Sequence, residues 1–173
     1  SENFKDIKAE LINASKKNKI TISSTFIKEE IVNGHIINAN KLLGHPYKIS
    51  GIVVKGMQLG RKLGFPTANM AYDNTEKILP KNGVYYTITK IKGKEYVSIT
   101  NIGIKPSIQE SNCISIETHI LDFNQSIYGQ NISIIFIDRI RNEIKFNHIN
   151  DLIDQITKDV STVRKLNSLH ITA

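Results

Sequence analysis

The sequence contains a single cysteine, Cys113, and no tryptophan. One cysteine cannot form an intramolecular disulfide, so the composition indicates a reducing compartment, and we expect a cytoplasmic protein. No apolar run approaches the roughly 20 residues that a membrane-spanning helix needs. The first 20 residues mix charged and apolar side chains and lack the apolar block of a signal peptide. We therefore expect neither a helical membrane protein nor a disulfide-stabilised secreted domain.

Acidic residues are few relative to basic ones: 16 Asp and Glu stand against 23 Lys and Arg, a formal net charge of +7. A basic protein attracts polyanions such as nucleic acid, anionic lipid or phosphorylated small molecules. A basic nucleic-acid-binding barrel is one alternative, because small barrels bind oligonucleotides through exposed aromatic side chains beside basic ones. Aromatic residues make up only 7% of the chain, however, and the lysines are scattered. The charge alone does not identify the partner.

The first 44 residues have helical patterns. A helix with its N-cap at Ser24 or Thr25 is expected to end at Gly34, and the next helix is expected to end at Gly44. The spacing of apolar residues predicts an earlier helix over roughly residues 3–15.

From Tyr47 onward the pattern changes to short runs rich in β-branched and aromatic residues, separated by Gly, Asn or Pro. Gly93 separates two of these runs, so residues 84–102 are expected to form a hairpin. Five or six such strands predict a small antiparallel barrel that is closed or nearly closed. The predicted strands are 47–56, 83–93, 94–103, 114–121 and 131–141.

The last segment, residues 150–167, returns to helical spacing, with Asn150 as the expected N-cap. Its apolar side chains form one stripe, which we expect to pack against the barrel. The stripe consists of Ile153, Ile156, Val160 and Val163.

The stretch GRKLGFPTAN, residues 60–69, combines glycines and cations with two small oxygen-bearing side chains. Glycines let a backbone approach an anion closely, and successive N–H groups can bind phosphate. Arg61 and Lys62 add positive charge. The spacing of Gly56, Gly60 and Gly64 matches neither the Walker motif nor the dinucleotide fingerprint. From the residues alone, a phosphate loop and a plain glycine-rich turn both stay open.

Thr67 and Asn69 lie two residues apart, so in an extended chain their side chains point the same way. Neutral oxygens of this kind suit Mg²⁺ when phosphate supplies the charge, although they could equally bond local backbone groups. Glu117 and His119 share one face of a predicted strand. Glu117 could act as a general base or could simply be an exposed surface residue. His119 is another candidate base, but its spacing does not favour it over Glu117.

Taken together, these segments resemble riboflavin kinase, in particular the C-terminal kinase module of the bacterial bifunctional riboflavin kinase/FAD synthetase. The resemblance covers about residues 47–166 and is most specific at GRKLGFPTAN. The other matching strings follow in the same order as in the family. They are PKNGVYY, NIGIKPS, IETHILDF, IYGQNISIIF, IRNEIKF and LIDQITKD.

The resemblance implies a mainly β fold, a six-stranded antiparallel Greek-key barrel with a C-terminal helix packed on it. It implies transfer of the γ-phosphoryl of ATP to the 5′-hydroxyl of riboflavin, giving FMN and ADP. Glu117 would be the catalytic base, and Thr67 and Asn69 would bind Mg²⁺ and contact ATP. The other expected ATP-binding residues are Gly56, Gly60, Arg61 and Gly64. The expected flavin-binding residues are Ile120, Tyr128, Arg141 and Phe146.

The same resemblance divides the chain into a helical leader, residues 1–46, and a kinase barrel, residues 47–173. The leader is similar to the tail of the FAD synthetase module, with Lys28 in ISSTFIK where the family usually has Arg. The chain carries no HxGH-type motif, so we expect it to make FMN and not FAD. It does not begin with Met, and we expect a fragment of a parent with a covalently linked N-terminal adenylyltransferase domain. A non-catalytic flavin-nucleotide-binding module is the second alternative, although Glu117, Thr67 and Asn69 are all present.

Overall fold

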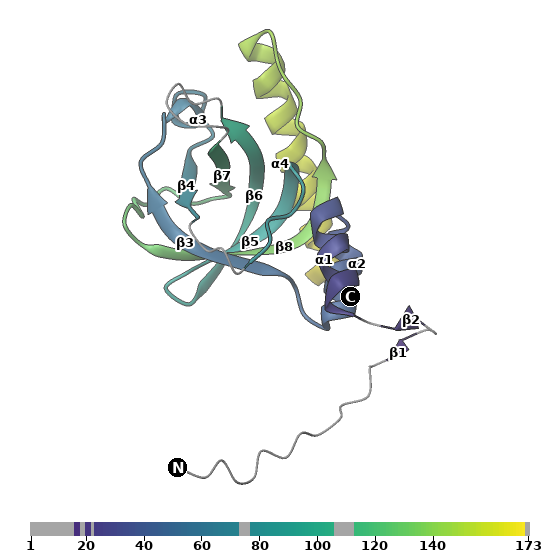
Figure 1. Cartoon of the computed structure of the whole chain (residues 1–173). Coiled ribbons are helices and arrows are strands. Elements are labelled where there is room, and N and C mark those ends of the chain that lie inside the picture. The colour runs from purple at the N-terminus through teal and green to yellow at the C-terminus, as the bar shows by residue number, and fades with distance from the viewer. Residues whose placement is uncertain (1–15, 18–19, 22, 73–76, 106–112, 172–173) are drawn as a thin grey trace, which may run out of the picture.

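Six antiparallel strands form a closed barrel in the computed structural model, in the order β3-β4-β7-β6-β5-β8 (Figure 1). The strands are β3 (Lys48–Val54), β4 (Thr67–Ala71), β5 (Gly83–Ile91), β6 (Lys94–Lys105), β7 (Cys113–Ile120) and β8 (Asn131–Arg141). The structure describes residues 16–17, 20–21, 23–72, 77–105 and 113–171. β5, β6 and β7 are sequential neighbours and β8 returns beside β5, which is a Greek key. The predicted fold class is therefore confirmed.

The predicted hairpin is formed by β5 and β6, which pair from Gly83↔Ile102 to Ile91↔Lys94. Its turn consists of Lys92 and Gly93, both with positive φ, at 48° and 84°. Two consecutive residues with positive φ match the twist of the flanking strands, and a glycine takes the second position without strain. The two-residue turn therefore fixes the register of the β5–β6 hairpin.

β4 is the sixth strand, and the sequence patterns did not single it out. It is only five residues long and begins at Thr67, inside the stretch that reads as a loop. The preceding residues form one helical turn, α3 (Leu59–Lys62). The stretch 60–69, interpreted as a loop from its glycines and proline, is therefore helical at its start and a strand at its end.

Two short helices, α1 (Ser24–Asn33) and α2 (Ile36–Leu43), precede the barrel. The N-cap of α1 is Ser23 and not Ser24 or Thr25: Ser23 has extended backbone angles, and its hydroxyl accepts a hydrogen bond from Phe26 N at 3.1 Å. Both helices end at a left-handed glycine, Gly34 and Gly44, as predicted. The expected helix over 3–15 lies outside the described residues; a small pair, β1 (Lys16–Lys17) and β2 (Ile20–Thr21), comes before α1.

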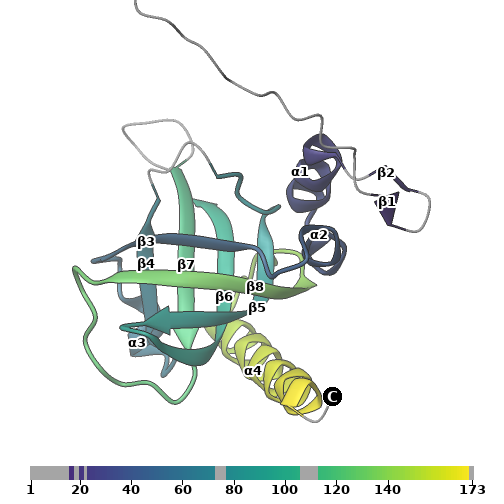
Figure 2. The same ribbon diagram turned by 90° about the horizontal axis from the view of Figure 1, so that it is seen from below.

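The helix α2 packs against β8 at one end of the barrel (Figure 2). Ile36 and Ala39 are buried there. Asn40 joins the helix to β8 and to the residue before β3: its amide donates to Phe136 O at 2.9 Å, and its carbonyl accepts from Tyr47 N at 2.7 Å. This side chain satisfies backbone groups at the point where the chain enters β3.

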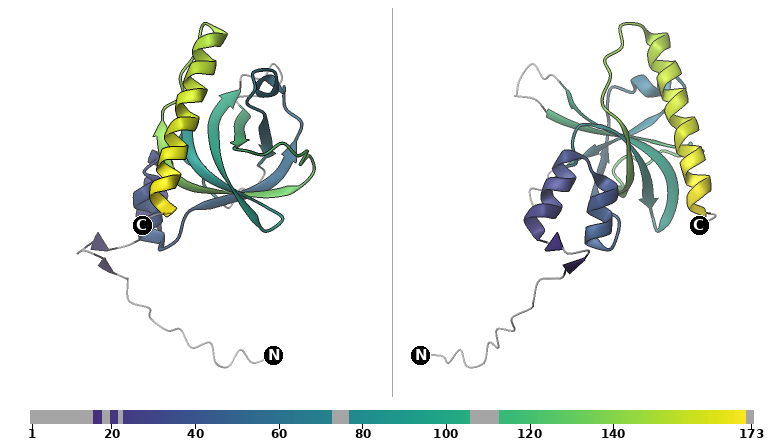
Figure 3. Two further views of the ribbon diagram at one scale, coloured as in Figure 1. Left: turned by 180° about the vertical axis from the view of Figure 1, so that it is seen from behind. Right: turned by 90° about the vertical axis from the view of Figure 1, so that its right-hand side faces the viewer.

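The C-terminal helix α4 (Ile149–Ile171) runs along the outside of the barrel (Figure 3). It begins one residue before Asn150, so Asn150 is not the N-cap that its residue type suggested. Two members of the predicted stripe face the barrel: Val163 is fully buried, and Val160 packs against the cluster that contains Val163 and Val84. In the part of the chain that the structure describes, no helix is both long and apolar enough to span a bilayer.

Candidate active site

The pairing of β4 with β7 brings four of the candidate side chains together. Asn69 lies opposite Glu117 in the register, and Thr67 lies opposite His119. The intervening residues Ala68, Met70, Ile116 and Thr118 are buried inside the barrel. By strand alternation the four candidates therefore share the outer surface of the barrel wall.

Glu117 is held by hydroxyl groups. The Thr67 hydroxyl donates to its Oε2 at 3.4 Å, and the Ser115 hydroxyl donates to its Oε1 at 3.2 Å. Two donors on opposite oxygens restrict rotation of the carboxylate and keep it ready to accept a further hydrogen bond.

His119 has a different environment. Its Nδ1 lies 2.8 Å from Pro66 O. A carbonyl can only accept, so Nδ1 carries the proton and donates it. The ring also meets Phe65 edge-on, with centroids 5.6 Å apart. His119 therefore anchors the end of the glycine-rich segment.

The glycines of this segment allow it to fold back on β4. A Cβ at Gly56 would lie 2.4 Å from the Asn69 side-chain nitrogen, and a Cβ at Gly60 would lie 2.3 Å from Phe65 O. At Gly60 the neighbouring atom is backbone, so only glycine fits there, whereas any larger residue at Gly56 would displace the Asn69 side chain. Arg61, the predicted phosphate ligand of this segment, is exposed on α3.

Two cavities of about 250 Å³ each adjoin this wall. The barrel-mouth cavity is bounded by Gln58 and Arg61 on one side and by residues 123–128 on the other. The helix-side cavity lies between the strands and α4, and its main apolar walls are Leu59, Leu63, Phe65, Ile144, Phe146, Leu152 and Ile156.

Thr67 lines both cavities, whereas Glu117 lines only the helix-side cavity. The four expected flavin-binding residues are divided between them. Arg141 and Phe146 line the helix-side cavity with Glu117. Ile120 and Tyr128 line the barrel-mouth cavity.

A family model described as riboflavin kinase (Flavokinase) matches residues 43–167, more than half of the chain. The chain belongs to the riboflavin kinase family. Curated relatives agree. The "Bifunctional riboflavin kinase/FMN adenylyltransferase" of Bacillus subtilis is 46% identical over 140 residues, which are 80% of this chain and 44% of that protein. The protein of the same name from Buchnera aphidicola is 43% identical over 166 residues, which are 94% of this chain and 52% of that protein.

The chain thus spans about half the length of the curated relatives that it matches. A crystal structure described as that of a "Macrolide-efflux Protein from Streptococcus pneumoniae" has the same fold. It superposes with a TM-score of 0.83 at 34% identity, covering 88% of this chain and 50% of that one. The barrel with its flanking helices is therefore a fold already seen by crystallography.

The oxygen-bearing side chains on the outer surface of β4 and β7 fit a magnesium ion better than a softer metal. Among the described residues, no three His, Cys, Asp or Glu side chains form a group that could hold a metal ion. Thr67 and Asn69 instead provide neutral oxygen-bearing groups on one surface, beside the Glu117 carboxylate. Hard oxygen donors that leave room for water and phosphate are the environment that Mg²⁺ prefers.

Sequence reasoning missed two charged residues of the helix-side cavity, Glu143 and Asp159. Asp159 lines this cavity and is only 4% exposed. The signal that could have found it was its position on α4, three residues after Ile156 and next to Val160, within the apolar stripe. An aspartate at such a position must be paired when it is buried.

Proposed function

We propose that this chain transfers the γ-phosphoryl group of ATP to the 5′-hydroxyl of riboflavin, giving FMN and ADP. The observation that carries the proposal is the position of Thr67 and Glu117. Thr67 lines both cavities, and the Glu117 carboxylate, hydrogen-bonded to Thr67, lines only one of them. An acceptor in one cavity and a phosphate donor in the other would meet at this pair.

The linings of the two cavities support an assignment of the substrates. The helix-side cavity has extended apolar walls, which suit a flat ring system, and it contains the carboxylate that the acceptor hydroxyl needs. The barrel-mouth cavity adjoins α3 and contains Arg61, which suits a polyphosphate. Under this assignment Arg141 and Phe146 contact the flavin. Ile120 and Tyr128, expected to contact the flavin, would contact the nucleotide instead.

In the proposed reaction Glu117 accepts the proton of the riboflavin 5′-hydroxyl while that oxygen forms a bond to the γ-phosphorus. The bond from the γ-phosphorus to its bridging oxygen breaks, and its electron pair leaves on ADP. Phosphoryl transfer depends mainly on alignment and charge neutralisation, and Arg61 supplies positive charge beside the donor cavity. Of the glycines expected to bind ATP, Gly60 lines the helix-side cavity and the Gly64 N–H donates to Arg61 O at 3.3 Å, so we assign the phosphate contact to Arg61 and Thr67 before Gly56, Gly60 and Gly64.

Thr67 Oγ1 and Asn69 Oδ1 would hold Mg²⁺ together with oxygens of ATP. When bound, the ion would neutralise charge on the transferred phosphoryl group. Because both protein donors are neutral, the chain alone would hold the ion weakly, and ATP would bring most of the opposing charge.

The curated relatives are named as bifunctional, with an FMN adenylyltransferase activity beside the kinase. We propose that a longer parent of this chain has a covalently linked adenylyltransferase domain. The candidate catalytic and substrate-binding residues in the described barrel are those of the kinase reaction. We therefore expect the chain as given to produce FMN without FAD.

The decisive test is one incubation of the purified chain with riboflavin and Mg²⁺-ATP, analysed for FMN, FAD and ADP. We expect FMN and ADP in equal amounts, no FAD, and no FMN when EDTA is added. Quenching of riboflavin fluorescence without FMN would favour a non-catalytic flavin-binding module. A salt-sensitive gel shift with plain oligonucleotides and no flavin quenching would favour the nucleic-acid-binding barrel.

A further inference from the structure

We propose that Asp159 is a positioning residue for flavin binding: it orients the guanidinium of Arg141 so that one edge stays available for the carbonyl oxygens of the flavin ring. The inference rests on the proposed function, since it takes the helix-side cavity as the flavin site. Asp159 would act through Arg141 and would not contact the reacting atoms.

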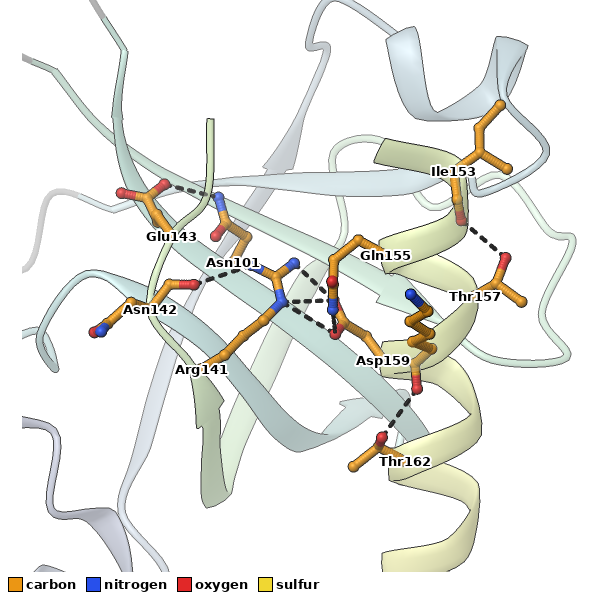
Figure 4. Close-up of polar contacts among 10 residues, drawn as sticks. Asn101, Arg141, Asn142, Glu143, Ile153, Gln155, Thr157, Asp159 and Thr162 are labelled. Carbon is orange, nitrogen blue, oxygen red and sulfur yellow. Dashed lines mark hydrogen bonds and ion pairs between the residues drawn. The ribbon is translucent and has the colours of Figure 1, made fainter. Parts of the chain in front are cut away.

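The ion pair between the two residues is bidentate and largely shielded from solvent (Figure 4). Arg141 Nε donates to both Asp159 oxygens at 3.0 Å, and Nη2 donates to Oδ2 at 2.7 Å. Gln155, one turn earlier on α4, donates to Asp159 Oδ1 at 2.9 Å. Gln155 on α4 therefore helps to orient the Asp159 carboxylate, and this carboxylate in turn orients Arg141 on β8.

The remaining hydrogens of Arg141 define the edge that stays available. A guanidinium has five N–H bonds in one plane. Asp159 takes the Nε–H and one Nη2–H, and Asn142 O accepts from Nη1 at 3.0 Å. One N–H on each terminal nitrogen is left without a partner among the residues that the structure describes. Arg141 lines the helix-side cavity, and two such N–H groups suit a ligand with carbonyl acceptors.

The same interactions hold the cavity wall that follows β8. The bond to Asn142 O fixes the start of this segment, and Asn101 Nδ2 donates to Glu143 Oε1 at 3.3 Å (Figure 4). Gly103 leaves the space for that carboxylate, since a Cβ there would lie 2.1 Å from Glu143 Oε1. Ile144 and Phe146, further along this segment, form part of the apolar lining.

Stability alone does not account for a charged pair at this place. Replacing a buried ion pair by apolar side chains of similar size is often neutral or stabilising, because desolvation offsets the attraction. The chain has a second bidentate pair, Asp122 with Arg164, on the exposed surface. Only the Arg141 pair lies in the helix-side cavity, so a role in ligand binding explains its position.

The test compares Asp159→Asn with Asp122→Asn, which alters the exposed pair in which Arg164 donates through Nη1 and Nη2. For Asp159→Asn we expect the riboflavin Kd from fluorescence quenching, and the riboflavin KM, to rise about tenfold or more, as befits a disturbed charge-assisted contact. The ATP KM should stay within about twofold, because Arg141 lies outside the barrel-mouth cavity. Asp122→Asn should leave the riboflavin Kd unchanged. A merely structural role would lower the Tm without separating the two KM values.

Because Asp159→Asn leaves a charge unpaired and could unfold the chain, the double variant Arg141→Met with Asp159→Leu provides a second test. It removes both charges together, and we expect a folded protein with the same loss of riboflavin affinity. Riboflavin binding at wild-type strength in the double variant, or in a folded Asp159→Asn protein, would overturn the inference while FMN formation by the wild type still stands. If the wild type itself neither quenches riboflavin fluorescence nor forms FMN, the proposed function fails, and the inference fails with it.

Discussion

Glu117 lies on β7 between two hydroxyl donors, Thr67 on the neighbouring strand and Ser115 two residues earlier on its own strand. Their hydrogen bonds orient the carboxylate, and neither hydroxyl can accept a proton at neutral pH in its place. A substrate hydroxyl in the helix-side cavity would find this carboxylate as the nearest acidic group of the β4–β7 wall. Its role as the base is the most direct consequence of the proposed function.

Replacing Glu117 by Gln keeps the size of the side chain but removes its ability to take the proton. We expect kcat to fall by about 10²–10⁴-fold, roughly 3–5 kcal/mol in the barrier, with the Tm nearly unchanged. Initial rates of FMN formation at saturating riboflavin and ATP measure this. Glu95→Gln, at the exposed hairpin end, serves as the control with wild-type rates. A folded Glu117→Gln protein with near-normal kcat would remove Glu117 from the base role.

At the residue scale, the sequence predicts which side chains share a face but not which strands lie side by side. Alternation groups Glu117 with His119 and Thr67 with Asn69, and the structure agrees on both pairs. That the two pairs face each other follows from the β4–β7 register, which is set by barrel closure. Closure of the barrel also places Ile120 and Arg141 in different cavities, which no local sequence pattern could predict.

At the scale of elements, β5, β6 and β7 carry a continuous row of buried hydroxyl groups inside the barrel. Its members are Thr89, Ser98, Thr87, Thr100 and Thr118, and neighbouring hydroxyls lie 2.7–3.0 Å apart. Each hydroxyl has one hydrogen. Because Ser98 donates to Thr87 O at 3.1 Å, Ser98 must accept from both Thr87 and Thr89. Thr100 then donates to Thr87, and Thr118 donates to Thr100, so a single arrangement satisfies the whole row.

Ser98 is the member on which this row depends most, since it accepts two hydrogen bonds. We expect Ser98→Ala to lower the free energy of unfolding by about 1–3 kcal/mol, because the Thr87 and Thr89 hydroxyls would lose their acceptor in a dry interior. Urea denaturation measures the change. Ser50→Ala is the matched control: its hydroxyl pairs with Ser133 at 2.8 Å on the exposed surface, and its loss should cost less than about 0.5 kcal/mol. Equal losses in the two variants would contradict the argument.

Elements with strong local signals were predictable, and those defined by their neighbours were not. The hairpin at Gly93 and the helix ends at Gly34 and Gly44 require positive φ, which a single residue can supply. The start of α1 was misplaced because three adjacent hydroxyl residues compete for the cap and only the backbone angles of Ser23 select it. β4 lacked a signal because its ladder partners, and not its five residues, make it a strand.

At the scale of the whole molecule, Tyr47 joins the two helices to the barrel. Its N–H donates to Asn40, its carbonyl accepts from Phe136 N at 2.8 Å, and its hydroxyl donates to Ile78 O at 2.6 Å. The sequence suggested a boundary between residues 46 and 47. The contacts of α2 with β8 support an alternative, which we propose: α1 and α2 fold together with the barrel.

This junction predicts how stability depends on alkaline pH. Burial raises the pKa of Tyr47 from 10.0 to about 12, and the neighbouring Tyr72 phenol adds to the increase. Burial also raises the pKa of Tyr72, Tyr85 and Tyr86. Above pH 10 the unfolded chain releases these protons while the folded chain retains them. The folded state then binds more protons, so its stability must fall as pH rises.

We therefore expect tyrosine ionisation to leave the urea midpoint unchanged below about pH 10, where all these phenols are protonated in both states. Between pH 10 and 12 the midpoint should fall. Tyr47→Phe tests the assignment, since phenylalanine does not titrate. That variant should be less stable near neutral pH by about 1 kcal/mol, from the lost bond to Ile78 O, but should lose less stability on going to alkaline pH. Phenolate absorbance would follow the titration of the remaining tyrosines. Parallel stability curves for the two proteins would show that Tyr47 is not the group whose burial opposes ionisation.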